Sequence, residues 1–287
     1  MQDSQLTAKV TQDGSYTFFS QEYQEAFHSN FGAKQEAEVR YIKPCLIEQL
    51  AAKQSTIRLL DICYGLGYNS AAALDAIWAI NPSCQVELMA LEIDLDVPRQ
   101  AIENNFLDTW RKPIPQLLAF LAKDLTVTNE LLQAQLIIGD ARQTIQPLIH
   151  SGWQADAIFL DPFSPPKCPQ LWTVEFIKLI SHCITPNGRL ATYSSSAAVR
   201  TALLLAGFQI SSVTGVGRKS PGTIASFEYK NLPTLSLQSQ EHLKTRAAIP
   251  YHDPDLTAQP AEIIIQRQQQ QTQGDWESTS QWRKRWF

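Results

Sequence analysis

Short apolar runs alternate with helical patterns through the middle of the chain. The runs that read as strands are Thr56–Ile62, Gln85–Leu91, Gln135–Ile138, Ala155–Leu160, Arg189–Tyr193, Gln209–Val213 and Ile224–Tyr229. The segments with helical periodicity are Lys34–Lys53, Ser70–Ile80, Val97–Asn104, Arg142–Ser151, Leu171–Cys183 and Ala197–Ala206. This alternation predicts βαβ units and a mostly parallel sheet covered by helices on both faces.

The last two predicted strands have no helix between them. Gly215, Gly217, Pro221 and Gly222 connect them, which favours an antiparallel hairpin. The pattern therefore predicts an α/β, Rossmann-like fold with a seven-stranded, mostly parallel sheet that ends in an antiparallel hairpin. This is the arrangement of class I methyltransferases that use S-adenosylmethionine (SAM).

Three parts of the chain are expected. Residues 1–55 form an N-terminal extension and a helix that packs on the core, residues 56–230 form the methyltransferase domain, and residues 231–287 form a C-terminal tail. Residues 105–134 interrupt the alternation and predict a partly helical insertion. The glutamine-rich stretch Gln266–Gln273 predicts a polar helix or a loose tail, and four aromatic residues near the end predict that the tail docks: Trp276, Trp282, Trp286 and Phe287.

Composition narrows the class of protein. A hydrophobic content of 44% and a charged content of 18% are ordinary for a globular chain. The start of the chain lacks an apolar signal core, and no apolar run could cross a bilayer, so we expect a soluble, cytoplasmic protein. The five cysteines have no C-x-x-C spacing, which argues against a disulfide framework and against a metal site.

Charge is unevenly distributed along the chain. Residues 1–188 carry a net charge of −8, residues 189–246 a net charge of +5, and residues 247–287 a net charge of −1. A basic segment in an acidic protein is either a phosphate-binding face or ordinary solvated surface.

A glycine-containing loop follows the first predicted strand of the sheet. It reads Asp61-Ile-Cys-Tyr64-Gly65-Leu-Gly67-Tyr-Asn69 and opens a helix. Glycines let the backbone turn sharply and approach a ligand closely. The third glycine of a dinucleotide-binding loop is missing, which favours SAM over NAD or FAD, although a purely structural turn is the alternative.

Acidic residues follow the next two strands. Glu92 comes 25 residues after Gly67, where an acid can accept hydrogen bonds from ribose hydroxyls. Asp140 follows the third strand, where its carboxylate can meet the adenine amino group with the backbone of Ala141 nearby. Each acid alone could be a loop or cap residue, but the three strand ends together predict a SAM site.

The fourth predicted strand runs into Leu160-Asp161-Pro-Phe163-Ser-Pro-Pro-Lys167-Cys-Pro-Gln-Leu-Trp172. Ligands bind outside the carboxyl ends of parallel strands, so Asp161 is placed to hold a nucleophile near the transferred methyl. Phe163 could stack on a base or pack in the core, and core packing is the expected role of Trp172.

At this point the sequence resembles the methyltransferase module of the MnmC-like tRNA-modifying enzymes. The family pattern at strand four, L-D-G-F-A-P-x-K-x-P-x-x-W, is matched by Leu160, Asp161, Phe163, Pro165, Lys167, Pro169 and Trp172. The family's G-x-G-x-N, L-A-T-[FY]-[ST]-S-x-x-x-V-R and G-[FV]-G-R-K segments match at Gly65 to Asn69, at Leu190 to Arg200 and at Gly215 to Lys219. The resemblance covers roughly residues 14–229.

The resemblance implies a tRNA partner and N-methylation of a 5-aminomethyl group on (2-thio)uridine at the wobble position. The chain has no room for the FAD-dependent oxidase module of the bifunctional family members. Pro162 replaces the family's usual glycine, and the resulting Asp161-Pro-Phe-Ser is similar to the D-P-P-Y signature of adenine and glutamine N-methyltransferases. Pro166 and Cys168 also depart from the pattern.

The resemblance and the chemistry together suggest roles for the remaining residues. Asp161 is expected to position the amine, and Lys167, Arg200, Arg218 and Lys219 to contact phosphate or simply to lie on the surface. Two other readings stay open: an aminopropyltransferase or another amine-directed transferase on this fold, and a SAM-binding RNA-associated protein without turnover.

Overall fold

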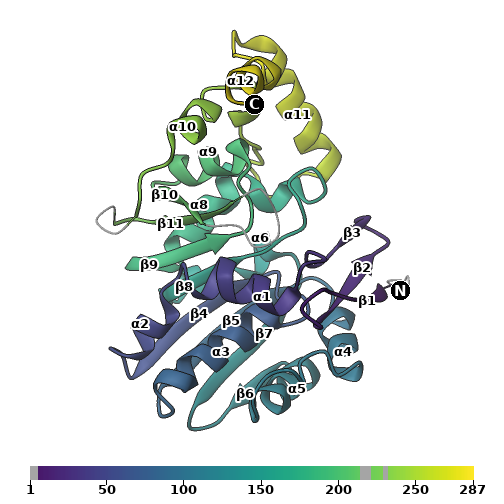
Figure 1. Cartoon of the computed structure of the whole chain (residues 1–287), viewed down its shortest axis with the longest axis vertical. Helices are drawn as coiled ribbons and strands as arrows, with labels where there is room; N and C mark the ends of the chain where they lie inside the picture. Colours follow the sequence, from purple (N-terminus) through teal and green to yellow (C-terminus); the bar gives the residue numbers. More distant parts are fainter. Residues whose placement is uncertain (1–5, 214–220, 229–231) are drawn as a thin grey trace.

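The computed structural model describes residues 6–213, 221–228 and 232–287 (Figure 1). Its main sheet has eight strands in the order β10-β11-β9-β8-β4-β5-β7-β6. Their bounds are β4 Thr56–Ile62, β5 Gln85–Glu92, β6 Thr126–Thr128, β7 Leu132–Ile138, β8 Ala155–Leu160, β9 Ile184–Thr192, β10 Gln209–Val213 and β11 Gly222–Ser226. The α/β fold with a mostly parallel sheet is confirmed, and so is the antiparallel pairing of β10 with β11.

Strand order reverses at the middle of the sheet. The chain runs from β4 outward to β5 and β7, then returns to the other side of β4 to add β8 and β9. The loops after β4 and β8 therefore leave the sheet in opposite directions and open a crevice at the carboxyl ends of the strands.

Helices cover both faces of this sheet. Their bounds are α1 Ala33–Ala37, η1 Glu38–Ile42, α2 Ile47–Ala51, α3 Tyr68–Ile80, α4 Asp96–Glu103, α5 Ile114–Asp124, α6 Ala141–Thr144, α7 Gln146–His150, η2 Pro169–Trp172, α8 Val174–His182, α9 Ala197–Leu205, α10 Leu237–His242, η4 Arg246–Ala248, α11 Pro260–Gln273 and α12 Thr279–Trp286. Two clusters of buried side chains pack against the sheet: one joins it to α1 through α5, the other to α6 through α9.

The main sheet has one strand more than the seven predicted. The extra strand is β6, which pairs antiparallel with the outer side of β7. Its three residues are too few to show an alternating pattern. The segment 105–134, expected as a partly helical insertion, holds this strand and helix α5.

Two predicted helices are broken where proline interrupts them. The segment Lys34–Lys53 divides into α1, the π-helix η1 and α2, with Pro44 in the interruption and Leu46 at a positive φ of 55°. The segment Arg142–Ser151 divides into α6 and α7, with Pro147 at the start of α7. Proline has no N–H to donate to the preceding turn, so the helical hydrogen bonds cannot run through.

Strand β9 begins five residues earlier than predicted. Its first half contains Pro186-Asn187-Gly188, which by sequence resembles a turn, and its register against β8 shifts between Ala155 and Ala157. A bulge thus accommodates turn-type residues within a strand. Strand β11 is likewise shifted toward the N-terminus, and the predicted end at Tyr229 lies outside the described residues.

The N-terminal extension forms a small separate sheet that we did not predict. Strands β1 Leu6–Val10, β2 Tyr16–Ser20 and β3 Glu25–Ala26 pair antiparallel in that order, and Figure 1 places this sheet near α4. The signal was present in the sequence, because Asp13-Gly14 separates two short runs rich in β-forming residues.

The C-terminal segment, with α10, α11 and α12, lies at the top of the molecule in Figure 1, where η4 contacts α9 and α11 contacts η2. Trp282 is buried and stacks on His242, with ring centroids 4.3 Å apart, whereas Trp276 and Phe287 are exposed. Trp282 therefore holds α12 against α10 within the tail, whereas the tail docks on the rest of the chain through Tyr251 and Ile263, which are buried in the second core cluster. The glutamine-rich stretch lies within helix α11.

Candidate functional site

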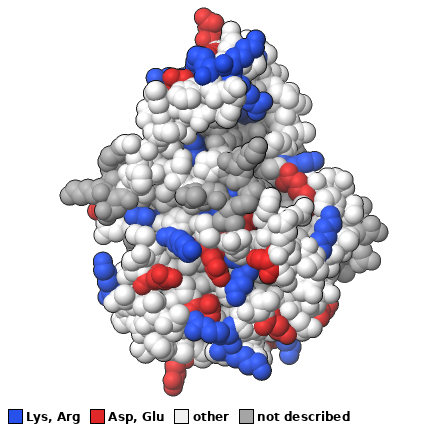
Figure 2. Space-filling view, in the orientation of Figure 1, with Lys and Arg blue, Asp and Glu red and all other residues white. Residues whose placement is uncertain are grey.

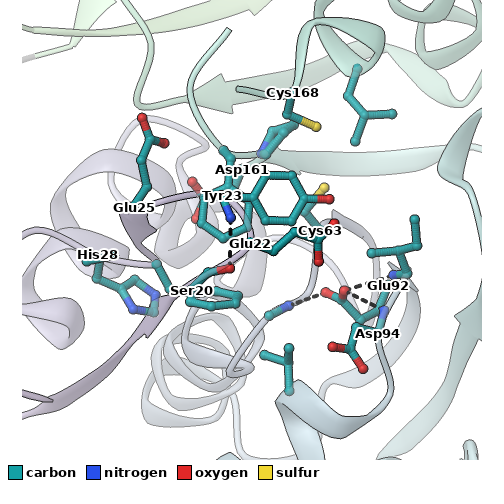
Figure 3. Close-up of a pocket in the computed structure, with 18 of the residues that line it drawn as sticks. Ser20, Glu22, Tyr23, Glu25, His28, Cys63, Glu92, Asp94, Asp161 and Cys168 are labelled. Carbon is teal, nitrogen blue, oxygen red and sulfur yellow. Dashed lines mark hydrogen bonds between the residues drawn. The ribbon is translucent and has the colours of Figure 1, made fainter. Parts of the chain in front are cut away.

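A cavity of about 1370 Å³ lies where β4, β5, β7 and β8 end (Figure 3). Its wall contains Cys63, Glu92, Asp140 and Asp161, one residue from the loop after each of these strands or from the strand end itself. The crevice at the strand-order reversal thus opens into this cavity. Small-molecule pockets usually span about 300–1,000 Å³, so this one has room for a cofactor and part of an acceptor.

The loop after β4 turns into α3 through two glycines with positive φ. Gly65, at 55°, lines the cavity, and its N–H donates to Glu92 Oε2 at 2.7 Å. Gly67, at 83°, lies behind the wall, and a Cβ there would be 2.5 Å from the Tyr64 hydroxyl. Tyr64 is buried and does not line the cavity. Gly65 therefore faces the cavity, whereas Gly67 and Tyr64 shape the turn.

Asp61 and Asn69 also lie behind the cavity wall. Asp61 is fully buried and its Oδ2 accepts a hydrogen bond from Ser70 Oγ at 2.7 Å, which ties the start of α3 to β4. Asn69 Nδ2 donates to Asp161 Oδ2 at 3.0 Å. Asp61 therefore affects the cavity through Ser70 and the start of α3, and Asn69 affects it through Asp161.

Glu92 lies at the end of β5 and is held firmly by backbone amides. Its Oε2 accepts from Gly65, and its Oε1 accepts from Ile93 at 2.8 Å and Asp94 at 3.0 Å. A carboxylate has about four acceptor positions, so one remains on Oε2 for a ligand hydroxyl. Burial raises the pKa of Glu92, and the three backbone hydrogen bonds oppose that rise.

Asp140 follows β7 and reaches the cavity together with Gly139 and Ala141. Its Oδ1 accepts from the backbone N–H of Arg142 at 2.9 Å, which caps the short helix α6. The Arg142 guanidinium, which does not line the cavity, contacts the same carboxylate and fixes the orientation of Asp140.

Asp161 and the loop after β8 form the opposite wall. Besides the contact with Asn69, Asp161 lies beside the buried Tyr41. Burial, and next the Asp161 charge, raise the pKa of Tyr41, so its hydroxyl stays neutral. Two backbone carbonyls hold the loop itself in place. The Pro162 carbonyl accepts a hydrogen bond from the Tyr193 hydroxyl at 2.9 Å, and the Phe163 carbonyl accepts one from Trp172 Nε1 at 2.9 Å.

Phe163 lines the cavity, but one of its faces is already covered. The Tyr23 ring stacks on it with a centroid distance of 4.2 Å and an interplanar angle of 14°, and Phe27 meets it edge-on at 4.9 Å. Beside this stack, the Glu25 carboxylate accepts hydrogen bonds from the backbone N–H and the hydroxyl of Ser164.

The N-terminal sheet therefore supplies a wall of the cavity, which sequence reasoning missed. Residues from Ser20 to Phe31 line it, among them Tyr23, Glu25 and His28 in Figure 3. Asp94 and Tyr193 are among the other lining residues that were not predicted. The sequence signal that could have found this wall is the hairpin pattern around Asp13-Gly14, although that pattern does not say where the hairpin docks.

The predicted basic residues do not gather at one place. Lys167 is exposed on the loop after β8. Arg200 is only 3% exposed, and its guanidinium donates to Thr223 Oγ1, Ser212 Oγ and the Gly222 carbonyl, so it braces the hairpin from inside instead of presenting its charge to phosphate. Arg218 and Lys219 lie outside the described residues.

The described lining of the cavity is acidic. It contains eight carboxylates, namely Glu22, Glu25, Glu36, Glu92, Asp94, Asp96, Asp140 and Asp161, against His28 and Arg99 as the basic side chains. A lining with this many negative charges repels an anionic ligand and attracts a cationic one. A sulfonium and a protonated amine both carry a positive charge, so the acidic lining favours them.

These residues fit SAM. Gly65 lets the backbone approach a ligand, Glu92 keeps one acceptor position on the cavity side, and Asp140 and Ala141 offer an acceptor and backbone at the third strand end. Among the described residues no group of three or more His, Cys, Asp or Glu could hold a metal ion. Within the same residues, no helix combines the length and apolar character needed to cross a membrane.

Comparisons with known proteins point to the same class of cofactor. Residues 99–228 match a family model described as S-adenosyl-L-methionine-dependent methyltransferase. The crystal structure of MnmC2 from Aquifex aeolicus is similar with a TM-score of 0.84 at 33% identity, covering 95% of this chain and 87% of that chain. An uncharacterised protein of Methanocaldococcus jannaschii is 34% identical over 270 residues, which is 90% of this chain and 70% of the relative.

Bifunctional relatives match over a smaller share of their length. The tRNA 5-methylaminomethyl-2-thiouridine biosynthesis bifunctional protein MnmC of Paracidovorax citrulli is 29% identical over 232 residues, which is 74% of this chain and 34% of the relative. This chain thus spans about a third of the bifunctional protein.

Proposed function

The chain belongs to the family of SAM-dependent methyltransferases that includes Aquifex aeolicus MnmC2 and the methyltransferase part of MnmC, and on this premise we propose that it methylates a tRNA wobble uridine. The acceptor is the primary amine of a 5-aminomethyl group on uridine or 2-thiouridine, and the product is 5-methylaminomethyl(-2-thio)uridine. An enzyme with this substrate is expected in the cytoplasm.

The observation that carries the proposal is the position of Asp161. Its carboxylate lines the cavity and is held by Asn69, a residue of the glycine loop's own helix. One contact thus joins the acceptor side of the cavity to the cofactor loop. A carboxylate fixed in this way can accept a hydrogen bond from the amine, favour the orientation in which the lone pair faces the donor, and help to take the proton.

Bound SAM supplies an electrophilic methyl group on a sulfonium, which a neutral primary amine can attack in line. The other residues then provide placement: the loop after β8 is fixed by Tyr193 and Trp172, and the aromatic wall of Tyr23, Phe27 and Phe163 offers apolar surface to a base. Fixing both reactants is an entropic advantage that can supply much of the rate enhancement.

Surface charge is compatible with an RNA that lies outside the acidic cavity. Arg283 and Lys284 are exposed in the last turn of α12, beside Arg285, which is ion-paired with Glu241 and Glu277. Figure 2 shows blue side chains gathered at that end of the molecule. Lys167 adds a positive charge on the loop after β8. Phosphates are attracted to such groups, whereas the acidic cavity would admit only the nucleoside.

The proposal is tested with Asp161→Asn. This change keeps size but removes the charge, and we expect single-turnover transfer from labelled SAM to tRNA that contains 5-aminomethyluridine to fall roughly 10²-fold or more, with SAM affinity nearly unchanged. Asp124→Asn, at the exposed end of α5, is the matched control. A near-normal rate in Asp161→Asn would refute the role of this carboxylate.

The acceptor is identified separately by mass spectrometry of wobble uridines from cells that lack the gene. Accumulation of 5-aminomethyluridine supports the proposal. Unchanged wobble uridines, or transfer of an aminopropyl group to a polyamine by the purified protein, would favour an amine-directed transferase of another kind. SAM binding without turnover on any tRNA would favour the non-catalytic reading.

A further inference from the structure

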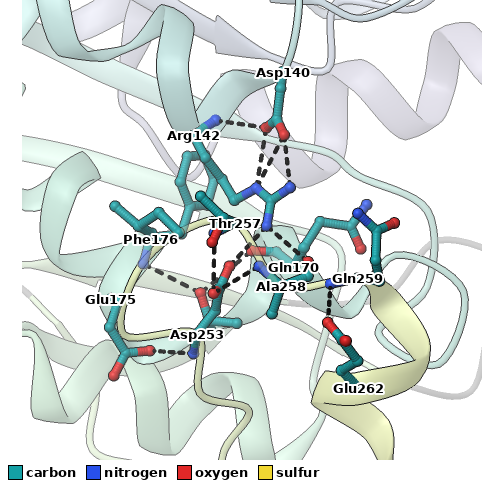
Figure 4. Close-up of polar contacts among 12 residues, drawn as sticks. Asp140, Arg142, Gln170, Glu175, Phe176, Asp253, Thr257, Ala258, Gln259 and Glu262 are labelled. Atoms are coloured by element: carbon teal, nitrogen blue, oxygen red, sulfur yellow. Dashed lines mark hydrogen bonds and ion pairs between the residues drawn. The ribbon is translucent and has the colours of Figure 1, made fainter.

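One guanidinium joins the cofactor side of the cavity to the C-terminal segment (Figure 4). Arg142 Nη2 donates to Asp140 Oδ2 at 2.7 Å, and its Nε lies 3.2 and 3.1 Å from the two oxygens of the same carboxylate. From the other side, Arg142 Nη1 donates to Asp253 Oδ2 at 2.7 Å and to the Ala258 carbonyl at 3.0 Å. The Arg142 side chain is only 9% exposed.

Asp253 is the centre of a rigid turn that docks on α8. It is 1% exposed, and its Oδ1 accepts from the backbone N–H groups of Thr257 and Ala258, both at 3.1 Å. Its own N–H donates to Glu175 Oε2 at 2.8 Å. The position of Asp253 is therefore set by the C-terminal segment and by α8, and not by the cavity.

The position of the Arg142 guanidinium depends on both carboxylates, Asp140 and Asp253. Burial lowers the pKa of Arg142, but its hydrogen bonds and charge interactions with Asp140 and Asp253 outweigh this, so the guanidinium stays protonated. When one partner of a buried ion pair is removed, the remaining charge is left uncompensated and rearranges. Without Asp253, the guanidinium would turn further onto Asp140, which is the carboxylate that faces the cavity.

We propose that Arg142 and Asp253 are positioning residues for the adenine end of SAM: Asp253 orients Arg142, and Arg142 fixes Asp140 in the orientation that accepts the exocyclic amino group. The C-terminal segment thereby contributes to cofactor recognition across 111 positions of sequence. This inference rests on the placement of the adenine at Asp140 and is independent of the acceptor.

The experiment compares two ligands that differ at that amino group. S-Adenosylhomocysteine carries the amino donor, whereas S-inosylhomocysteine carries an oxygen acceptor, which a carboxylate repels. Both dissociation constants are measured by titration calorimetry in the full chain. We expect the wild type to prefer the adenosyl ligand by about tenfold or more, because an unpaired buried acceptor is costly.

Asp253→Asn keeps the Oδ1 acceptor for the turn but replaces the oxygen facing Arg142 with an amide donor. We expect adenosyl affinity to fall about fivefold or more and inosyl affinity to stay within about twofold, so the preference shrinks. Glu262→Gln is the matched control. Glu262 caps α11 in the same segment by accepting from the Gln259 N–H, and it has no part in the Arg142 contacts, so the preference should persist.

If Asp253→Asn does not fold, Arg142→Lys replaces it and should also reduce the preference for the adenosyl ligand. A lysine ammonium lacks the planar guanidinium that contacts both carboxylates at once. Asp140→Ala separates the two levels of the argument. Preference lost in Asp140→Ala but kept in Asp253→Asn and Arg142→Lys would overturn the positioning role alone. If all three variants keep the preference for the adenosyl ligand, the placement of the adenine at Asp140 is overturned as well. The acceptor assignment does not depend on this result, because it is measured on tRNA.

Discussion

Asp61 illustrates how a buried carboxyl shapes the cofactor loop without facing the ligand. Burial raises its pKa to about 8, the hydrogen bond from Ser70 opposes the rise, and the charges of Asp161 and Glu92 add to it. Its Oδ1 has no hydrogen-bond partner among the described residues. Asp61 is therefore predominantly protonated at neutral pH, and its charge is not available to a ligand.

This shift predicts a dependence of stability on pH. The unfolded chain loses the Asp61 proton near pH 4 and the folded chain only near pH 8, so the folded state binds more protons in between and loses stability as pH rises through this window. Asp61→Asn keeps the acceptor for Ser70 and removes the titration. We expect its melting temperature to exceed that of the wild type by about 3 °C or more at pH 8, with the difference shrinking toward pH 4.

Thermal unfolding followed by circular dichroism between pH 4 and pH 8 checks this expectation. The Asp124→Asn variant, which alters an exposed carboxylate, serves as the control and should follow the wild type. A difference between wild type and Asp61→Asn that stays constant over this range would show that Asp61 is ionised in the folded state.

The small N-terminal sheet has a defined role in the cavity wall. Tyr23 and Glu25 are close in sequence, and they contact Phe163 and Ser164, which are adjacent in the loop after β8. Two neighbouring contacts of different chemistry hold the sheet against the loop that carries Asp161. The wall on the acceptor side is thus built by a segment outside the methyltransferase fold itself.

Loss of this contact is expected to affect the acceptor and spare the cofactor. In Glu25→Ala, the KM for tRNA should rise about three- to tenfold, on the scale of a hydrogen bond to a charged group, while SAM affinity stays within about twofold. Ser164→Ala should have a smaller effect, and in the Glu25→Ala background it should add little, because both changes remove one interaction. Strictly additive effects in steady-state kinetics would mean that the two residues act separately.

The sequence predicted the central elements well for a physical reason. Thr56–Ile62 and Ala155–Leu160 agree to the residue with the central strands β4 and β8, because strands covered on both faces show compact apolar runs. Gln209–Val213 also agrees with β10, an edge strand whose exposed and buried residues are mixed. Short elements such as β6 have no such signal, and Pro44 breaks a helix whose apolar periodicity continues through it.

The sequence indicates the cavity lining where it depends on strand ends, and it gives no sign of the lining that depends on how the N-terminal segment docks. Glu92, Asp140 and Asp161 line one cavity because parallel strands bring their carboxyl ends together. Tyr23 carries no local sign that it will meet Phe163, and an arginine such as Arg200 looks the same in sequence whether it braces a hairpin or faces solvent.

Charge is divided between the inside of the cavity and the outer surface. The described lining is acidic, whereas α12, at the top of the molecule in Figure 2, exposes basic side chains, and Lys167 is exposed on the loop after β8. Binding of tRNA should therefore weaken as salt rises, because phosphate contacts release counterions. SAM binding inside the cavity should depend on salt much less.

Lys167 provides the specific test of this surface. In Lys167→Ala the slope of log affinity for tRNA against log salt should flatten by about one unit, since one phosphate contact is lost. Lys178→Ala, which removes an exposed lysine from α8, is the matched control. If both variants give the same slope as the wild type in filter-binding or fluorescence titrations, Lys167 does not contact RNA.

The contact between Glu25 and Ser164 has a consequence for how the protein is made. These residues are 139 positions apart, and ribosomes add about 5–20 residues per second, so Tyr23 and Phe27 wait roughly 7 to 28 s before Phe163 is even synthesised. The contact between Gly65 and Glu92 spans only 27 positions. The glycine loop and β5 can therefore come together early on the nascent chain, whereas the Arg142–Asp253 contact behind Asp140 must wait for the C-terminal segment. The acceptor side also closes late, so its aromatic side chains stay exposed to chaperones in the meantime.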